Sequence, residues 1–231
     1  SKTWCKGLYL RLLILLIITL NIFAQELGNY IGPTLSQLNY LSNKKELKLC
    51  IGPDSMPFED FGKNGEYIGL TSDYYKIFSK NLNIPITVVP VNTWAESIEF
   101  AKNRKCDIIS AMQTEERKQY LNFTSPYLKT PVVIATNNDK PFISDFKDLT
   151  NKKIGVPKSY AYVEELKRIY PNINYVEVPT IKDGLKKVID GELYGQVGTL
   201  ACIGYFFITD FVGSLKIAGK TDKVNLELGI G

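Results

Sequence analysis

The stretch Cys106-Asp-Ile-Ile-Ser-Ala-Met-Gln-Thr-Glu-Glu-Arg117 decides the fold, because an apolar segment in it runs directly into a polar turn. Residues 106–112 predict a short strand. The turn carries one arginine, the side chain best suited to a bidentate grip on a carboxylate, so Arg117 is a candidate ligand-binding residue. The alternative interpretation is a solvated arginine beside Glu115 and Glu116, because charged side chains usually lie at the surface.

Upstream of this stretch, strands and helices alternate. Strands are predicted over 47–51 and 86–89, and helices over 71–82 and 94–101. The first helix has Tyr74, Ile77, Phe78 and Leu82 on one face. The second begins at Trp94 with Thr93 as its N-cap. With the strand at 106–112 the order is β-α-β-α-β, which is typical of a parallel sheet covered by helices.

Downstream, the same kinds of element repeat. Strands are predicted over 132–136, 153–156, 173–178 and 194–198. Ser159 and Thr180 are predicted as N-caps of two further helices, the second of which ends before Gly191. The inward residues of that second helix are predicted to be Ile181, Leu185, Val188 and Ile189.

Two α/β units imply two lobes with a cleft between them, joined near 126–131. In open α/β sheets, ligands bind beyond the carboxyl ends of the strands. The loops that matter are therefore 52–60, 110–118, 157–160 and 198–200.

The first 24 residues differ from the rest of the chain. Three basic residues precede an apolar run over 12–24 that ends at the small residue Ala24, an order typical of a secretory signal. Counted from Leu8, the segment has 17 residues and approaches the length of a membrane-spanning helix. An uncleaved anchor is therefore the second interpretation, and a buried core helix is the third. Residues 25–45 are polar and are predicted to be a linker.

The composition limits the possible functions. The 231 residues are 45% hydrophobic and 23% charged, which is typical of a soluble globular protein and excludes a wholly disordered chain. The absence of histidine excludes Ser-His-Asp and Cys-His triads and the usual histidine-containing zinc sites. The favoured prediction includes no catalytic residue, metal site or cofactor. The net charge of +4 falls to +1 without the three basic residues near the N-terminus. We therefore do not expect a nucleic acid as a partner.

Several short sequence motifs occur in a fixed order along the chain. They are Pro57-Phe58, Gly69-x-x-x-Asp73, Trp94, Asp107-Ile-Ile, Thr114-Glu-Glu-Arg117, Phe123-Thr-Ser-Pro-Tyr127 and Gly155-Val-x-x-Ser159. This ordered set resembles the type II periplasmic solute-binding proteins, the extracellular solute-binding family 3 of amino-acid-binding proteins and related sensor domains. The resemblance runs from about Leu47 to the C-terminus. It implies an α/β, two-lobed Venus-flytrap fold.

The resemblance also implies roles for several residues. Arg117 would hold the α-carboxylate of the ligand, and Ser159 and Tyr160 would help from the second lobe. Free N–H groups at the start of a helix attract anions, which supports the second assignment, and a plain N-cap at Ser159 is compatible with it. Trp94 matches an aromatic residue that packs on the ligand side chain, and Phe58 is a similar case. A core position is the alternative for both.

The remaining candidates lie at strand ends and in one loop. Ser110 and Met112 alternate along their strand and are predicted to face the cleft, Met112 mainly through its backbone. Amino-acid binders of the family usually place an acid after the last strand of lobe two to hold the ligand's ammonium. The matching residue here is Thr199, whose hydroxyl carries no charge. Asp54 is a candidate to compensate, with a turn aspartate as the alternative. The ligand is predicted to be an amino acid or another carboxylate.

The cysteines lack C-x-x-C spacing, which argues against a metal site of cysteines. The resemblance places the strands that carry Cys50 and Cys106 side by side, and an exported protein can oxidise such a pair. Their offset is unfavourable for the narrow geometry of a disulfide, so the free thiols are favoured and pairing stays open. Cys202 is predicted to pack as a small hydrophobic residue.

The predicted domain plan follows from the resemblance. Residues 46–128 and 224–231 form lobe one, residues 129–223 form lobe two, and the chain crosses between them around 127–132 and 224–229. Family members continue with further elements of lobe one, so we expect the C-terminal part of that lobe to be missing after Gly231.

The predicted function is binding of a small solute in the periplasm, with closure of the lobes as the output. The partner would be a membrane-embedded sensor kinase or cyclase, or an ABC permease, and the segment 50–59 together with Thr199 favours the sensor. One alternative is an enzyme of the same fold, dehydratase-like or associated with a lytic transglycosylase, with Asp54 and Glu59 as an acid–base pair. Another is a membrane-anchored protein-interaction domain.

Overall fold

The computed structural model describes residues 34–231, so the predicted signal or anchor over 1–24 and the first part of the predicted linker lie outside the described residues. The chain divides into one unit up to Lys45 and a compact unit over Glu46–Gly231. In the first unit, α2 (Leu35–Asn43) begins with a capping box between Thr34 and Gln37. The linker prediction missed this helix, although Thr-x-x-Gln is its sequence signal. Within residues 34–231, no helix has both the length and the apolar character that a membrane span requires.

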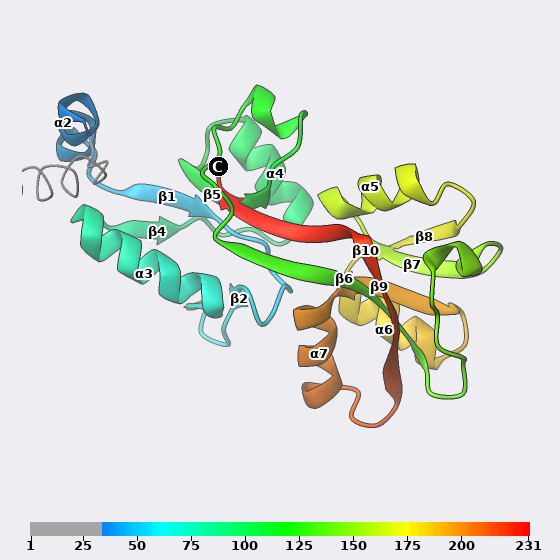
Figure 1. Cartoon of the computed structure of the whole chain (residues 1–231). Coiled ribbons are helices and arrows are strands. Elements are labelled where there is room, and N and C mark those ends of the chain that lie inside the picture. Colours follow the sequence, from blue (N-terminus) through cyan, green and yellow to red (C-terminus); the bar gives the residue numbers. More distant parts are fainter. Residues whose placement is uncertain (1–33) are drawn as a thin grey trace, which may run out of the picture. The chain divides into compact units, whose positions relative to one another are not determined.

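The compact unit is α/β, as predicted, and its described residues build an eight-stranded sheet of order β4-β1-β5-β10-β6-β9-β7-β8 (Figure 1). The strands are β1 (Leu47–Cys50), β4 (Ile86–Val88), β5 (Ile108–Met112), β6 (Leu128–Asn137), β7 (Lys153–Pro157), β8 (Asn174–Val178), β9 (Gly195–Thr199) and β10 (Leu215–Ile230). The helices are α3 (Leu70–Leu82), α4 (Trp94–Lys102), α5 (Ala161–Ile169), α6 (Ile181–Ile189) and α7 (Leu200–Thr209). A small hairpin, β2 (Asp60–Phe61) and β3 (Tyr67–Ile68), was not predicted.

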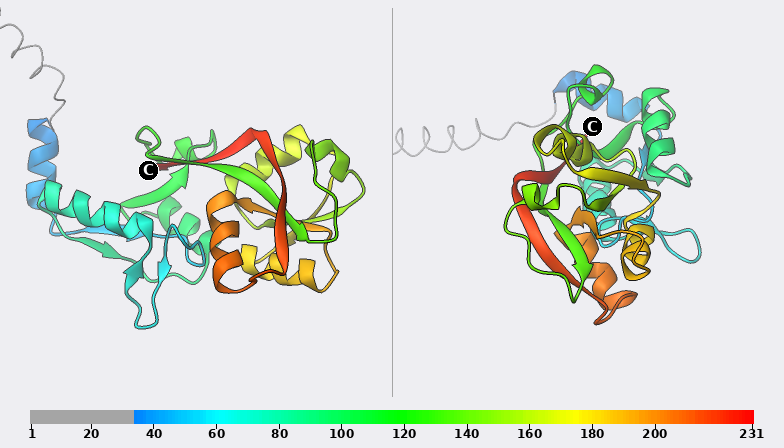
Figure 2. Two further views of the ribbon diagram at one scale, coloured as in Figure 1. Left: turned by 60° about the horizontal axis from the view of Figure 1, so that its bottom comes forward. Right: turned by 90° about the vertical axis from the view of Figure 1, so that its right-hand side faces the viewer.

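The elements group into two lobes joined by two long strands. Lobe one contains β4, β1 and β5 with α3 and α4 on opposite faces, and lobe two contains β9, β7 and β8 with α5 on one face and α6 and α7 on the other (Figure 1). β6 and β10 run antiparallel from one lobe to the other (Figure 2). Their register shifts between Thr221 and Asn225, opposite Pro131, whose missing N–H suits an interrupted ladder.

β1 lies inside lobe one because both of its faces carry apolar side chains that pack against helices. Leu49 and Ile51 pack with Tyr75 of α3 on one face, and Cys50 packs with Ala101 of α4 on the other. Successive residues of a strand point to opposite faces, so one apolar strand serves both helices. Lobe two has a larger core, whose fully buried side chains include Phe146, Ile154, Tyr162, Leu166 and Leu185.

Two predicted helix faces need correction. In α3 the buried residues are Thr71, Ser72 and Tyr75, whereas Ile77 is 54% exposed and Leu82 also lies at the surface. The tyrosine is tolerated inside because its hydroxyl bonds to Ser110 Oγ at 2.9 Å. In α6 Ile189 is exposed, because it is the last residue of the helix, beyond the part covered by the sheet.

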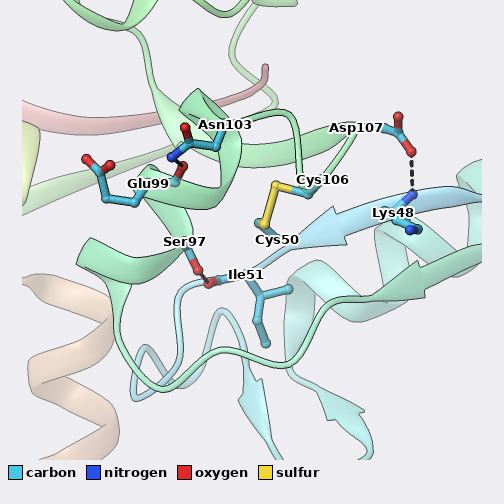
Figure 3. The surroundings of a disulfide bond; sticks show 8 residues. All are labelled: Lys48, Cys50, Ile51, Ser97, Glu99, Asn103, Cys106 and Asp107. Atoms are coloured by element: carbon cyan, nitrogen blue, oxygen red, sulfur yellow. Dashed lines mark hydrogen bonds between the residues drawn. A yellow bond between two sulfur atoms is a disulfide. The ribbon is translucent and has the colours of Figure 1, made fainter.

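Cys50 and Cys106 form a disulfide with Cα atoms 5.7 Å apart, so the favoured free thiols were wrong (Figure 3). The offset argument failed because Cys106 lies before β5, outside the ladder that pairs Cys50 with Ile109. The connection from α4 returns beside β1, where the Lys48 N–H donates to an Asp107 carboxylate oxygen at 2.9 Å. Cys202 is buried and unpaired among the described cysteines, as predicted.

Candidate ligand-binding cleft

A cavity of about 50 Å³ lies where strand ends of lobe one face the starts of α5 and α7 in lobe two. Its lining includes seven of the nine predicted site residues: Phe58, Trp94, Ser110, Met112, Arg117, Tyr160 and Thr199. Asp54 and Ser159 do not line it. Six of the seven lie in the four loops predicted at the carboxyl ends of the strands, and Trp94 is the first residue of α4.

Arg117 is buried at 6% exposure at the start of a short 3-10 helix, Arg117–Gln119. Its Nη1 donates to the Met112 carbonyl at 2.8 Å, and its guanidinium carbon lies 5.4 Å from the centre of the Trp94 ring. The alternative of a solvated arginine was wrong, because Glu115 pairs with Lys118 and Glu116 pairs with Lys102. Burial lowers the pKa of Arg117, and within residues 34–231 no acidic side chain forms an ion pair with it.

The two lobes contact each other directly beside Arg117. The Trp94 Nε1–H donates to the Ser159 carbonyl at 3.0 Å, and an Arg117 N–H reaches the same oxygen at 3.4 Å. The Tyr160 hydroxyl lies 2.9 Å from Ser55 Oγ. The cleft is therefore narrow and bridged by hydrogen bonds from both lobes.

Ser159 is not the N-cap of α5, contrary to the prediction. Its φ of 65° is left-handed, and Tyr160 occupies the N-cap position without a side-chain hydrogen bond to the helix. The left-handed turn presents the Ser159 carbonyl to lobe one, and the helix begins two residues later. Thr93 and Thr180, by contrast, cap α4 and α6 as predicted.

Two other polar residues of the lining, Ser110 and Thr199, are bonded within their own lobe. Ser110 Oγ lies 2.9 Å from the Tyr75 hydroxyl and 2.8 Å from the Tyr127 hydroxyl. Thr199 is the N-cap of α7, and its hydroxyl accepts from the Cys202 N–H at 3.3 Å. Phe58 is both cavity and core, because its ring joins the buried cluster of lobe two.

Asp54 lies in a turn and is replaced in the cavity by Glu59. The φ of Asp54 is 58°, and its N–H donates to Asp60 Oδ1 at 3.1 Å, which fits the turn interpretation. Glu59 is buried, with Oε1 accepting from the Gly52 N–H at 2.7 Å and Oε2 accepting from the Tyr67 hydroxyl at 2.8 Å. Burial, opposed by these two hydrogen bonds, raises the pKa of Glu59 to about 7. Glu59 was not among the ligand-binding residues predicted from the sequence, where it was a candidate for the acid–base pair of the enzyme alternative and part of the segment 50–59 that favours a sensor.

A second, larger pocket of about 480 Å³ adjoins the cavity on the side of α4 and α5. It shares Arg117 and Tyr160 with the cavity, and charged side chains of both lobes line it, among them Lys102, Glu116 and Glu164. Arg117 therefore borders both the small inner cavity and a wider polar pocket.

Residues 47–201 match the bacterial extracellular solute-binding proteins, family 3. The chain belongs to this family. The virulence sensor protein BvgS of Bordetella bronchiseptica is 22% identical over 192 residues, which are 83% of this chain and 16% of BvgS. ABC transporter arginine-binding protein 1 of Escherichia coli is 25% identical over 177 residues, which are 76% of this chain and 72% of that protein. The chain thus spans only a small part of the sensor relative.

The crystal structure of the periplasmic VFT2 domain of Bordetella pertussis BvgS has the same fold. The TM-score is 0.79 at 20% identity, over 86% of this chain and 85% of that chain. The predicted Venus-flytrap fold and the predicted family are therefore confirmed.

Proposed function

We propose that this domain binds a small carboxylate-bearing solute between its lobes, with Arg117 holding the carboxylate. The supporting observation is that Arg117 is buried, faces the cavity and lacks an acidic partner within residues 34–231. Burying a charge without a counter-charge is costly. The two carbonyls that accept from Arg117 satisfy only part of its five N–H donors, and a carboxylate matches the rest in a fork geometry.

Solute entry requires the lobes to separate. The cavity of about 50 Å³ has room for about three to five water-sized groups, whereas small-molecule sites usually enclose about 300–1,000 Å³. The contacts from Trp94 to Ser159 and from Ser55 to Tyr160 must open first, and they can re-form around the solute. The crossing strands β6 and β10, with their register shift at Thr221/Asn225, are the proposed hinge.

We assign the domain to sensing rather than transport. The sensor relative BvgS covers 83% of this chain, and the uncharged Thr199 departs from the acid that amino-acid carriers of the family usually place there. The domain would then lie in the periplasm and report closure to a membrane-embedded kinase or cyclase. Delivery to an ABC permease is the other destination that relatives represent.

The test is a thermal-shift screen against L-arginine, the other amino acids and small organic acids. A bound compound at about 100 times its Kd should stabilise the domain by about 2.7 kcal/mol. Arg117→Ala should weaken binding of that compound at least about 30-fold, because truncating one partner of a buried charge pair costs about 2–5 kcal/mol. Arg117→Lys should recover only part of the affinity. Affinity of Arg117→Ala within about threefold of the parent, or a screen without any stabilising compound, would refute the proposal.

A further inference from the structure

The cavity lining contains one basic and one acidic side chain, and no ion pair joins the two. Within residues 34–231, Arg117 is the one basic residue of its lining and Glu59 is the one acidic residue. Their exposures are 6% and 5%, and neither takes part in an ion pair within the same range. Isolated buried charges are unfavourable unless a partner compensates them. Both groups face the space that a ligand would enter.

Glu59 retains the capacity to accept a further hydrogen bond. Each of its oxygens accepts one, from the Gly52 N–H and the Tyr67 hydroxyl. An ionised carboxylate has about four acceptor sites, so about two are left. A cation placed at these sites would favour the ionised form, which burial alone disfavours.

Gly52 lies directly against this carboxylate, where a larger residue would not fit easily. A Cβ atom at residue 52 would lie 3.2 Å from Glu59 Oε1 and 3.2 Å from Trp94 Cε3. A side chain at residue 52 would therefore crowd both the carboxylate and the Trp94 ring, which line the same cavity. A cation in this cavity would have the Glu59 carboxylate and an aromatic ring among its neighbours, and both attract it.

Neither acid position considered from the sequence can take this role. Asp54 does not line the cavity. Thr199 is uncharged, is 1% exposed, and already accepts from the Cys202 N–H. Glu59 is therefore the acidic residue of the cavity lining that can hold a cation.

We propose that Glu59 is a specificity-determining residue that holds a cationic nitrogen of a zwitterionic solute, whose carboxylate lies on Arg117. This inference rests on the proposed function, because it adds a contact for the nitrogen of the same solute whose carboxylate Arg117 would hold. It predicts that the domain selects solutes by their nitrogen and that glutamine at position 59 removes this selection.

The experiment compares matched probes on the full chain in mild detergent. The probes are the protein amino acids and their deamino counterparts, such as alanine with propanoate, titrated after a thermal-shift screen. We expect at least one amine-bearing probe to bind at least about 30-fold more tightly than its counterpart. In Glu59→Gln the ratio should fall to within about threefold, with the affinity of the deamino acid nearly unchanged. The exposed control Glu115→Gln should keep the full ratio.

The outcomes separate the two proposals. If the parent protein binds amine-bearing probes and their deamino counterparts equally well, the role of Glu59 is overturned without any measurement on a variant. The proposed function still stands in that case if Arg117→Ala loses binding of both probe classes. A ratio that survives in a folded Glu59→Gln also overturns it. If no probe of either class binds, the proposed function and this inference fail together.

Discussion

Replacing Glu59 by glutamine should change how the stability of the domain depends on pH. Burial of the carboxyl, opposed by hydrogen bonds from Gly52 and Tyr67, raises its pKa from 4.5 in water to about 7 in the folded domain. At about 1.4 kcal/mol for a tenfold change in the ionisation equilibrium, the difference corresponds to roughly 3 kcal/mol. This free energy is the additional cost of ionising Glu59 in the folded domain without a ligand, compared with ionising it in water.

The sign follows from linkage. Because folding raises this pKa, the stability that the neutral carboxyl contributes is complete below about pH 4.5 and is lost as the pH rises through about 7. A glutamine cannot ionise, and its side-chain oxygen can still accept from the Gly52 N–H. The free energy of unfolding of Glu59→Gln minus that of the parent should therefore rise by roughly 3 kcal/mol between about pH 4.5 and pH 8.5.

Urea unfolding of both proteins at several values across this range measures the difference directly. Taking the difference cancels the titration of all other groups that the two proteins share. Glu115→Gln is the matched control, because its carboxylate is exposed and pairs only with Lys118, and its difference should stay flat. A Glu59→Gln difference that is constant within about 0.5 kcal/mol would show that Glu59 is not a desolvated carboxyl, and the reasoning would be refuted.

Three further predictions concern the disulfide, the backbone at Gly69 and the cleft. Replacing both cysteines of the 50–106 disulfide by alanine should lower the free energy of unfolding by up to about 4 kcal/mol in guanidinium unfolding, because the bridge closes a loop of 56 residues; an unchanged midpoint would contradict this. Gly69→Ala should cost more than about 2 kcal/mol in thermal unfolding, because Gly69 has φ 103° and a Cβ would overlap the Phe58 carbonyl oxygen; a smaller loss would contradict that overlap. In Trp4→Phe, Trp94 is the remaining tryptophan, and its fluorescence should change when a probe that binds by calorimetry saturates the cleft; constant emission would place Trp94 outside it.

The order of elements was predictable because most of them carry a periodic or capped pattern. Thr93 and Thr180 marked the starts of α4 and α6, and β-branched runs marked the strands of both lobes. β10 was not recognised as one strand, because its register shifts at Ile217/Gly219 and Thr221/Asn225 break the alternation that identifies strands. α7 is apolar almost all round, so periodicity could not identify it.

Site residues could be predicted from the sequence where the residue type itself indicates a binding role. They could not be predicted where the role depends on which of two similar residues is buried. For Arg117 the residue pattern left a solvated arginine open, and the resemblance to the family favoured the ligand role; in the structure Arg117 is buried and lines the cavity. Glu59 and Asp54 look alike in sequence, since both are acids in one loop. In the folded chain the hairpin β2–β3 follows this loop, and Glu59 is buried whereas Asp54 lies in a turn outside the cavity lining.

The disulfide and the cleft are connected through β1. Cys50 ends this strand, and Gly52, whose N–H bonds to Glu59, follows two residues later. The bond to Cys106 ties the same strand to the start of β5, whose far end carries Ser110 and Met112 of the cavity. The buried guanidinium of Arg117 and, when it is ionised, the carboxylate of Glu59 both destabilise the folded domain, so other parts of the fold must supply the stability. We infer that the disulfide beside the loop that carries Glu59 supplies part of this stability and limits the movement of the cavity-lining groups, while the proposed hinge at β6 and β10 lies outside the closed loop.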